Sequence, residues 1–305
     1  MATMNKQIII SITFLSVCLI WGTTWMAMKI AVESIPPITA TGLRFLLSAP
    51  LVILIAKAMK QPLMFPKGQR GFMGAVALLY FAIPFTLMIV GEQYISSGLA
   101  SIIFANMPIA VMAISMISLS LRLAPHQIIG LATAVISLCF ILSGELEIGD
   151  NNDQVGTLAL ITAVLIHAVM YVMTQKHGKG IHVVTYNALP SAIAAGLLLI
   201  TGWLFEQPTT ATFSADSIYA VIYLGVVASV VGIIAYFTLN QITSPFTASL
   251  CFLIFPIVAL LLDAWVNGNH LSVFSQQLLF PLLIGIVVAK TTKLPSWLIA
   301  RVDKP

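Results

Sequence analysis

The segment QYISSGLASIIFANMPI, residues 93–109, has a counterpart later in the chain, QITSPFTASLCFLIFPI, residues 241–257. The two align without gaps at a constant offset of 148 residues and are identical at seven of seventeen positions, including one Gln, two Ser and one Pro. Shared apolar bias explains some of these identities, but it does not favour the Gln, Ser and Pro pairs. The repeat therefore predicts two related halves that meet near residue 150, namely 1–150 and 151–305.

Composition places most of the chain in a lipid bilayer. Of its 305 residues, 59% are apolar and 8% are charged, and the mean hydropathy is +1.03. A soluble domain carries about 25% charged residues, so the surplus of apolar side chains must face lipid. These values exclude a soluble enzyme and a disordered protein.

Apolar runs, broken by Pro, Gly and polar clusters, predict the membrane-spanning helices, because a helical span needs about 20 residues. Ten such runs account for most of the chain and leave no room for a soluble domain. The expected fold is an all-α membrane protein with ten transmembrane helices, at residues 8–28, 37–56, 71–91, 97–119, 125–143, 155–175, 183–204, 217–238, 246–264 and 276–290.

The basic residues predict that both termini lie in the cytoplasm. With a cytoplasmic N-terminus, the inner loops hold 12 of the 14 Lys and Arg residues, whereas Glu145, Glu147, Asp150 and Asp153 share one outer loop. Such an asymmetry sets orientation, and it requires an even number of spans. The formal charge of +4 thus reflects topology, and no nucleic-acid partner is expected.

Five spans in each half make the second half enter the membrane from the opposite side. The halves are then inverted repeats, related by a pseudo-two-fold axis in the membrane plane. Transporters use this arrangement because exchanging two packings between the halves gives outward-open and inward-open states around one central site. The repeat therefore favours a secondary transporter that works by alternating access.

A channel and an intramembrane enzyme acting on lipid-linked substrates are the alternatives. A channel needs a ring of polar residues along its pore, and an enzyme needs paired carboxylates, a His cluster or a Ser/Lys arrangement, none of which the scattered polar residues supply. Phosphate-loop, H-E-x-x-H and C-x-x-C motifs are absent, and the three cysteines lie singly in apolar runs. Neither a cofactor nor a metal nor a catalytic residue is expected.

Four short segments carry a family resemblance. They are LIWGTTW at 19–25, LRFLL at 43–47, YISSGLAS at 94–101 leading to Pro108, and the second copy of the latter, ending in Pro256. With these segments the chain resembles, over nearly its whole length, the EamA family of the drug/metabolite transporter superfamily. The resemblance implies an inner-membrane carrier that exports amino acids, other metabolites or drugs.

The resemblance also implies the partners, a small-molecule substrate and membrane lipid, and it leaves a homodimer open. The sequence departs from the family pattern in two places. His167 stands where a Trp is frequent, and the acidic signature that often precedes the last helix of each half is missing. These departures bear on the substrate more than on the fold.

Aromatic residues deep in the predicted spans mark a candidate substrate cavity. Trp21 and Trp25 lie four residues apart and share one helix face, and His167 and Tyr171 repeat this spacing 146 residues later. Rings at such depth are not interface anchors, which belong at the headgroup level. Helix packing is the alternative for the rings, and for His167 a neutral imidazole bonded to a neighbour is the alternative to proton sensing. The other cavity candidates are Tyr80, Phe104, Asn106, Tyr236 and Phe252.

A few charged residues lie within or beside the spans. An unpaired guanidinium at Arg44 would be costly, so it needs an acid, carbonyls or water, with Glu92 and Glu33 as the nearest acids by depth. We expect Arg44, Glu92 and Lys29 to form a structural or gating group, with substrate binding by Arg44 and snorkelling of Lys29 as alternatives. Glu92 and Asp263 are candidates for proton coupling, and facilitated diffusion is the alternative.

Pro108 and Pro256 are candidate hinges. Each proline frees the carbonyl four residues earlier, at Phe104 and Phe252, and the alternative is a static kink. Small residues at short spacings predict close helix packing, as at Gly71 with Gly74 and at Gly225 with Ala228 and Gly232.

Overall fold

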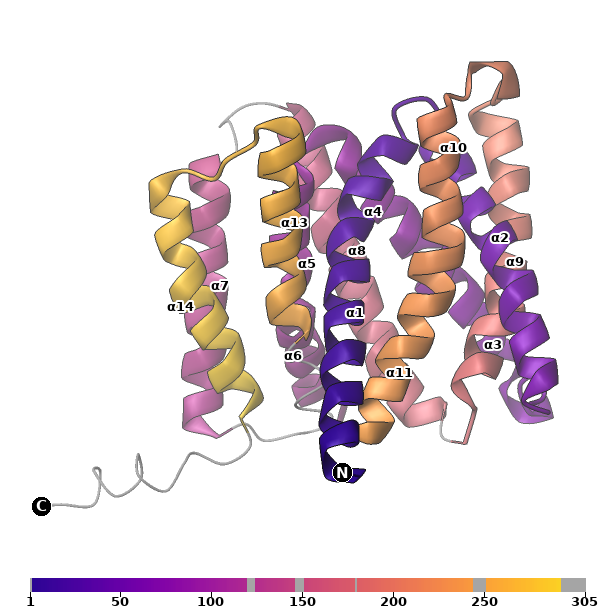
Figure 1. Ribbon diagram of the computed structural model, residues 1–305, viewed down its shortest axis with the longest axis horizontal. Helices are drawn as coiled ribbons and strands as arrows, with labels where there is room; N and C mark the ends of the chain where they lie inside the picture. Colours follow the sequence, from indigo (N-terminus) through magenta and orange to yellow (C-terminus); the bar gives the residue numbers. More distant parts are fainter. Residues whose placement is uncertain (1, 120–123, 146–150, 179, 244–250, 292–305) are drawn as a thin grey trace, which may run out of the picture.

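The protein is helical throughout the part of the chain that its structure, a computed structural model, describes (Figure 1). The described residues are 2–119, 124–145, 151–178, 180–243 and 251–291. Their α-helices are α1 (Ala2–Ala31), α2 (Pro37–Ala58), α3 (Arg70–Val76), α4 (Ile83–Tyr94), α5 (Ser97–Ala105), α6 (Met107–Leu119), α7 (Pro125–Glu145), α8 (Asn151–His177), α9 (Val183–Phe205), α10 (Ala215–Ile222), α11 (Gly232–Ile242), α13 (Cys251–Asn267) and α14 (Val273–Lys290).

Eight helical stretches of these residues are long and apolar enough to cross a membrane. They are Gln7–Ala31, Pro37–Ala58, Lys67–Tyr94, Ser97–Ser118, Pro125–Glu145, Asn152–Thr174, Val183–Phe205 and Ala215–Tyr236. Two shorter apolar helices, Ile254–Asn267 and Val273–Ala289, follow. The prediction of an all-helical membrane protein is confirmed. Residues 146–150, where the two predicted halves meet, and 246–250, the start of the predicted ninth span, lie outside the described residues.

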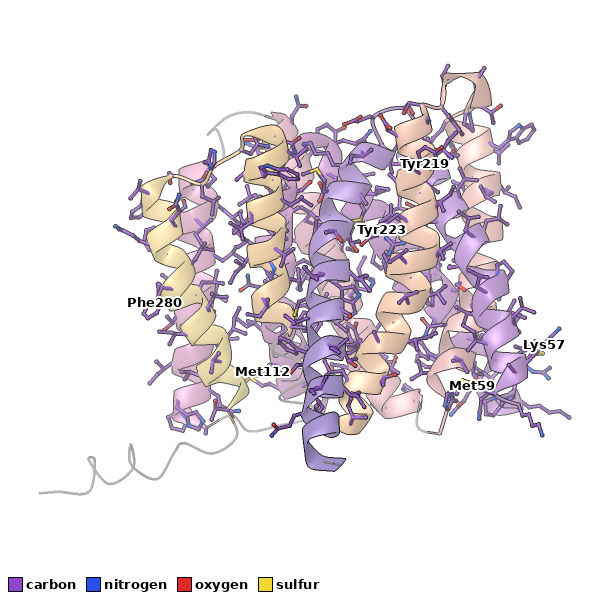
Figure 2. All side chains as sticks on the ribbon, viewed as in Figure 1. Lys57, Met59, Met112, Tyr219, Tyr223 and Phe280 are labelled. Carbon is purple, nitrogen blue, oxygen red and sulfur yellow. The ribbon has the colours of Figure 1, made fainter. Side chains whose placement is uncertain are left out.

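The outer surface of the bundle is apolar, as lipid requires. On α1, the side chains of Ile8, Ile12, Leu15 and Leu19 are exposed at the spacing of a single helix face. On α14, Phe280 points away from the bundle (Figure 2). Helices suit this environment because all their backbone groups are hydrogen-bonded within the segment.

The helices pack in pairs, and α1 and α8 lie near the middle of the bundle (Figure 1). At one side of the bundle α7 packs against α14, and at the other side α2 packs against α9. Between them, α1 contacts α11 and α13, whereas α8 contacts α4 and α6. The helix α1 begins, and α14 ends, at the same end of the bundle.

Two π-helices interrupt the helical runs at comparable places. One, η2 (Ala77–Ala82), joins α3 to α4 and packs on α9; the other, η4 (Tyr223–Val231), joins α10 to α11 and packs on α2. A π-helix has a wider turn than an α-helix and is frequently found at functional sites. Neither π-helix was predicted, because the sequence carries no signal that distinguishes one from a continuous helix.

The two candidate hinge prolines have different settings. The helix α5 ends at Ala105 and α6 begins at Met107, so Pro108 lies in the first turn of a new helix rather than in the middle of one, a position that proline favours. Pro256 lies inside α13. The break in the predicted span 97–119 therefore falls at Asn106.

Candidate substrate-binding cavity

A central cavity opens among α1, α2, α8, α9 and the two π-helices. It contains about 930 Å³ of space free of protein atoms, including its open mouth. Of the residues singled out from the sequence, it is lined by Trp21, Trp25, Arg44, Tyr80, Phe104, His167, Tyr171 and Phe252. The structure thus brings together residues from both halves of the chain.

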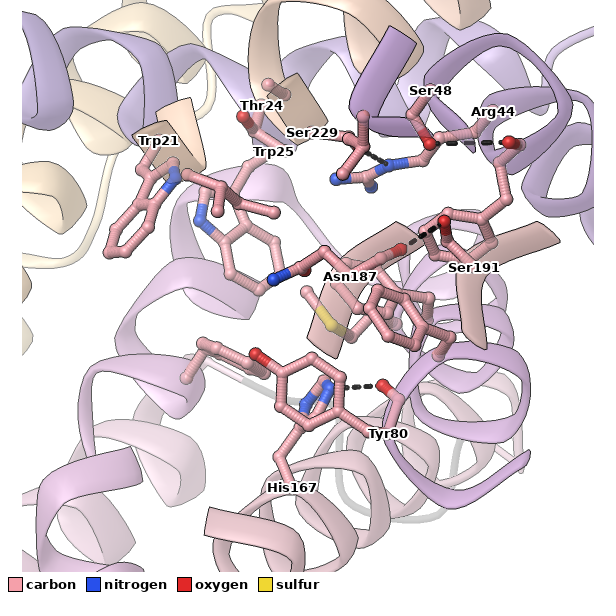
Figure 3. Close-up of a pocket in the computed structure, with 18 of the residues that line it drawn as sticks. Trp21, Thr24, Trp25, Arg44, Ser48, Tyr80, His167, Asn187, Ser191 and Ser229 are labelled. Atoms are coloured by element: carbon pink, nitrogen blue, oxygen red, sulfur yellow. Dashed lines mark hydrogen bonds between the residues drawn. The ribbon is translucent and has the colours of Figure 1, made fainter. Parts of the chain in front are cut away.

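One wall of the cavity is aromatic (Figure 3). The rings of Trp21 and Phe252 meet edge to face with centroids 5.5 Å apart, and those of Trp25 and Phe104 with centroids 5.3 Å apart. Trp25 is buried and Trp21 is half-buried. Such rings present flat apolar surfaces on which a substrate group can stack.

His167 joins this wall through a hydrogen bond to the π-helix η2. Its Nε2 lies 3.0 Å from the carbonyl oxygen of Tyr80, and the two rings meet edge to face with centroids 5.2 Å apart. A carbonyl oxygen only accepts, which assigns the hydrogen to Nε2. The hydroxyl of Tyr80 lies 3.4 Å from that of Tyr171. The imidazole thereby fixes the position of Tyr80 in the cavity wall.

Arg44 is the cation of the cavity wall. Its side chain is only 5% exposed, its Nε donates to Oγ of Ser229 at 2.9 Å, and its guanidinium lies 4.7 Å from the centroid of the Phe85 ring. Within the described ranges no acid pairs with it. In Figure 3 the terminal nitrogens of the guanidinium point toward the interior of the cavity.

Four polar residues that line the cavity were not predicted from the sequence. In Figure 3, Ser48 and Ser191 lie on the side of the cavity opposite Trp21, and the Asn187 amide reaches toward its middle. Asn187 donates from Nδ2 to the Val183 carbonyl at 2.8 Å. The cost of a polar group inside a span, which singled out Arg44, applies to these residues too and would have found them. They are Ser48, Asn187, Ser191 and Ser229.

Two predicted cavity residues do not line the cavity. Asn106 donates from Nδ2 to the Ile102 carbonyl at 2.9 Å and so completes the end of α5. Tyr236 packs behind the aromatic wall, with its ring centroid 4.9 Å from that of Trp21. Tyr236 thus supports the wall from outside the cavity.

The acidic residues predicted for gating or coupling lie apart from Arg44. Glu92 is fully buried and accepts a hydrogen bond from Ser97 at 2.7 Å. Asp263 accepts from the Gly98 amide at 2.9 Å, at the start of α5. Lys29 donates to the Ile95 carbonyl at 3.4 Å. The structure therefore gathers Glu92, Lys29 and Asp263 around the start of α5, outside the cavity lining.

Hydrogen bonds join the two halves at the end of the bundle where α1 ends. Glu206 accepts from the backbone amides of Ile38 and Thr39, both at 2.8 Å, and so caps α2. The hydroxyls of Ser34 and Ser214 lie 3.1 Å apart. The cavity lining includes Val52 of α2 and Asn187 of α9, which lie nearer the opposite end of the bundle.

Comparison with known proteins identifies the family. The model of the EamA-like transporter family matches this chain twice, over residues 8–143 and 154–291. Protein PagO of Salmonella typhimurium is 48% identical over 281 residues, which cover 92% of each chain. An uncharacterized transporter of Buchnera aphidicola is 44% identical, covering 93% of this chain and 95% of the relative.

More distant proteins are also consistent with a transporter of this family. The uncharacterized inner membrane transporter YedA of Escherichia coli is 25% identical, over 90% of this chain and 88% of its own. A solved crystal structure superposes with a TM-score of 0.66 at 17% identity, covering 97% of this chain and 99% of that one, which shows a similar fold. The protein is therefore a member of the EamA-like transporter family, a multi-pass inner-membrane transporter and not an enzyme.

Proposed function

We propose that this protein is a secondary transporter that moves small organic metabolites, such as amino acids and related compounds, or drugs by alternating access. The observation that carries the proposal is the central cavity, which has aromatic and polar lining residues and is built from both halves of the chain. Substrate would bind there in both states of the cycle.

Inverted repeats with five spans each are part of the proposal. The family model matches once in each half, and the packing pairs are those expected of a two-fold relation. The contact of α1 with α11 has its counterpart in the contact of α8 with α4, and the contact of η4 with α2 has its counterpart in that of η2 with α9. Two further contacts join equivalent helices of the two halves, α2 with α9 and α7 with α14. Each of these pairs would then lie across the two-fold axis.

The difference between the two ends of the bundle supports alternating access. Hydrogen bonds from Glu206 and between Ser34 and Ser214 join the halves at one end, which we take as the closed end, while the cavity lining includes residues nearer the other. A pseudo-two-fold axis makes a second state available, in which the halves exchange packings and the closed end opens. In that state these hydrogen bonds would be broken.

The orientation and direction of transport complete the proposal. We propose that both termini are cytoplasmic, on the distribution of Lys and Arg, and that transport is outward, on the family resemblance. A thiol introduced at position 150, which lies outside the described residues, should react with a membrane-impermeant maleimide from the periplasm. Reaction from the cytoplasm alone would reverse the orientation.

Flux measurements test the proposed function. Growth of a deletion strain and an overexpressing strain on amino acids and toxic analogues identifies a transported compound. In proteoliposomes this compound should show saturable uptake and counterflow, because a carrier returns loaded more readily than empty. Flux that neither saturates nor shows counterflow would instead indicate a channel.

A further inference from the structure

We propose that Arg44 binds the anionic group of the substrate, so that the transported compound is an organic carboxylate whose apolar part rests on the aromatic wall. This inference rests on the proposed function, because it names the substrate class of the same cavity. It assigns Arg44 to substrate binding rather than to the structural or gating group expected from its sequence position.

The first argument is the missing counter-charge. A buried guanidinium without a counter-charge is costly, and no Asp or Glu of the described residues pairs with Arg44. Glu92 accepts from Ser97, Asp263 from the Gly98 amide, and Glu206 from α2. Arg44 instead meets the Ser229 hydroxyl, a neutral acceptor for one of its five N–H groups. An anion in the cavity would supply the missing charge.

The second argument is the orientation of the guanidinium. Because Nε is held by Ser229, the two terminal nitrogens remain for a ligand, and they point into the cavity (Figure 3). Their parallel N–H groups match the two oxygens of a carboxylate. The Phe85 ring, 4.7 Å from the guanidinium, holds its plane in place.

The third argument is the charge balance of the lining. Among the described residues that line the cavity, Arg44 is the one Lys or Arg, and none is Asp or Glu. One cation balances the single charge of a carboxylate, whereas a phosphate monoester would bring a second, unbalanced charge. Beyond Arg44, Asn187 and Ser191 offer polar contacts, and Trp25 faces the apolar part of the ligand.

Four matched probes test the charge requirement on the purified full-length protein in lipid nanodiscs: phenylacetate, phenylacetamide, 2-phenylethylamine and phenyl phosphate. Binding is followed by quenching of tryptophan fluorescence. Phenylacetate should bind about tenfold more tightly than phenylacetamide, because a charge-assisted hydrogen bond is replaced by a neutral one. Arg44→Gln should remove this preference, and Arg44→Lys should keep part of it. Equal binding of acid and amide, tighter binding of the amine or the phosphate, or no binding of phenylacetate would overturn the proposal.

A chemical measurement on the native protein covers the case in which the Arg44 variants fail to fold. Phenylglyoxal modifies accessible guanidinium groups, and peptide mass analysis locates the product. Phenylacetate should slow modification of Arg44, and phenylacetamide should not. Arg70, which is exposed at a helix end, is the internal control and should react equally in both. Lack of protection of Arg44 would contradict the inference.

The outcomes separate this inference from the proposed function. Anion-selective binding without counterflow would sustain the role of Arg44 and remove the carrier function. Saturable counterflow with equal preference for the acid and amide probes would sustain the carrier and remove the role of Arg44.

Discussion

Gly130 of α7 and Gly285 of α14 meet backbone to backbone. A Cβ atom added at either glycine would lie 2.7 Å from the carbonyl oxygen of the other. Ala134 and Ala289, each four residues after the glycine of its helix, complete the contact from each side. Both pairs have the same offset of 155 residues in the sequence. The relationship is reciprocal, as a two-fold axis between the halves would require, and it depends on residues small enough for the backbones to approach.

Substitution of Gly285 by Val should loosen this contact. The added side chain would meet backbone atoms that cannot move without shifting a helix, which costs about 1–3 kcal/mol. The melting temperature of the purified protein should fall. Gly74→Val is the matched control, because a Cβ there meets nothing within 4 Å; an equal fall in both variants would contradict the assigned contact.

Replacement of Trp21 or Trp25 by Ala should impair transport, because each removes a ring of the cavity wall on which substrate stacks. We expect kcat/KM to fall by about tenfold, with the protein still inserted. Trp203→Ala and Trp265→Ala are controls, since these rings are 71% and 83% exposed on the outer surface. Unchanged kinetics in both cavity variants would remove the assignment.

The cap from Glu206 to α2 should hold one end of the transporter shut. Without the carboxylate two backbone amides lose their acceptor, which costs about 1 kcal/mol. Glu206→Ala should therefore increase the population open at that end, and a maleimide applied from that side should label Ser48→Cys faster. Glu33→Ala, which removes an exposed acid near the same end, should leave the rate unchanged. The cap has no gating role if the two variants behave alike.

Proton coupling through Glu92 gives another expectation. In the structure, one of its buried oxygens has no hydrogen-bond partner, whereas the Asp263 carboxylate accepts from Gly98, Asn267 and Asn269. An amide cannot gain and release a proton as a carboxyl group does. Glu92→Gln should therefore abolish stimulation by a pH gradient while counterflow persists. Asp263→Asn should lower the melting temperature and keep that stimulation. A Glu92→Gln variant that still responds to the gradient would favour facilitated diffusion.

The helical architecture was predictable because lipid leaves the backbone few choices. An apolar run long enough to cross the bilayer must form a helix, so the predicted spans lie close to the observed helices. The spacing of four residues in Trp21 with Trp25, and in His167 with Tyr171, also identified side chains that line one cavity.

The rotation of each helix about its own axis could not be predicted from the sequence. Position along a span gives depth, which suggested Glu92 as the partner of Arg44. The rotation of α2 turns Arg44 toward η4, where it meets Ser229 instead. The same limit applies to the glycines. A Cβ at Gly71 or Gly74 would meet only open space, although their spacing predicted packing.

The closed end provides the most direct measurement of alternating access. Ser34 and Ser214, whose hydroxyls lie 3.1 Å apart, can be replaced together by Cys in a chain whose three native cysteines are changed to Ala. Oxidation should join them, lock that end shut and stop counterflow, and a reductant should restore it; the single variant S34C should respond to neither. Counterflow that continues at full rate through the cross-linked protein would contradict a cycle in which this end must open.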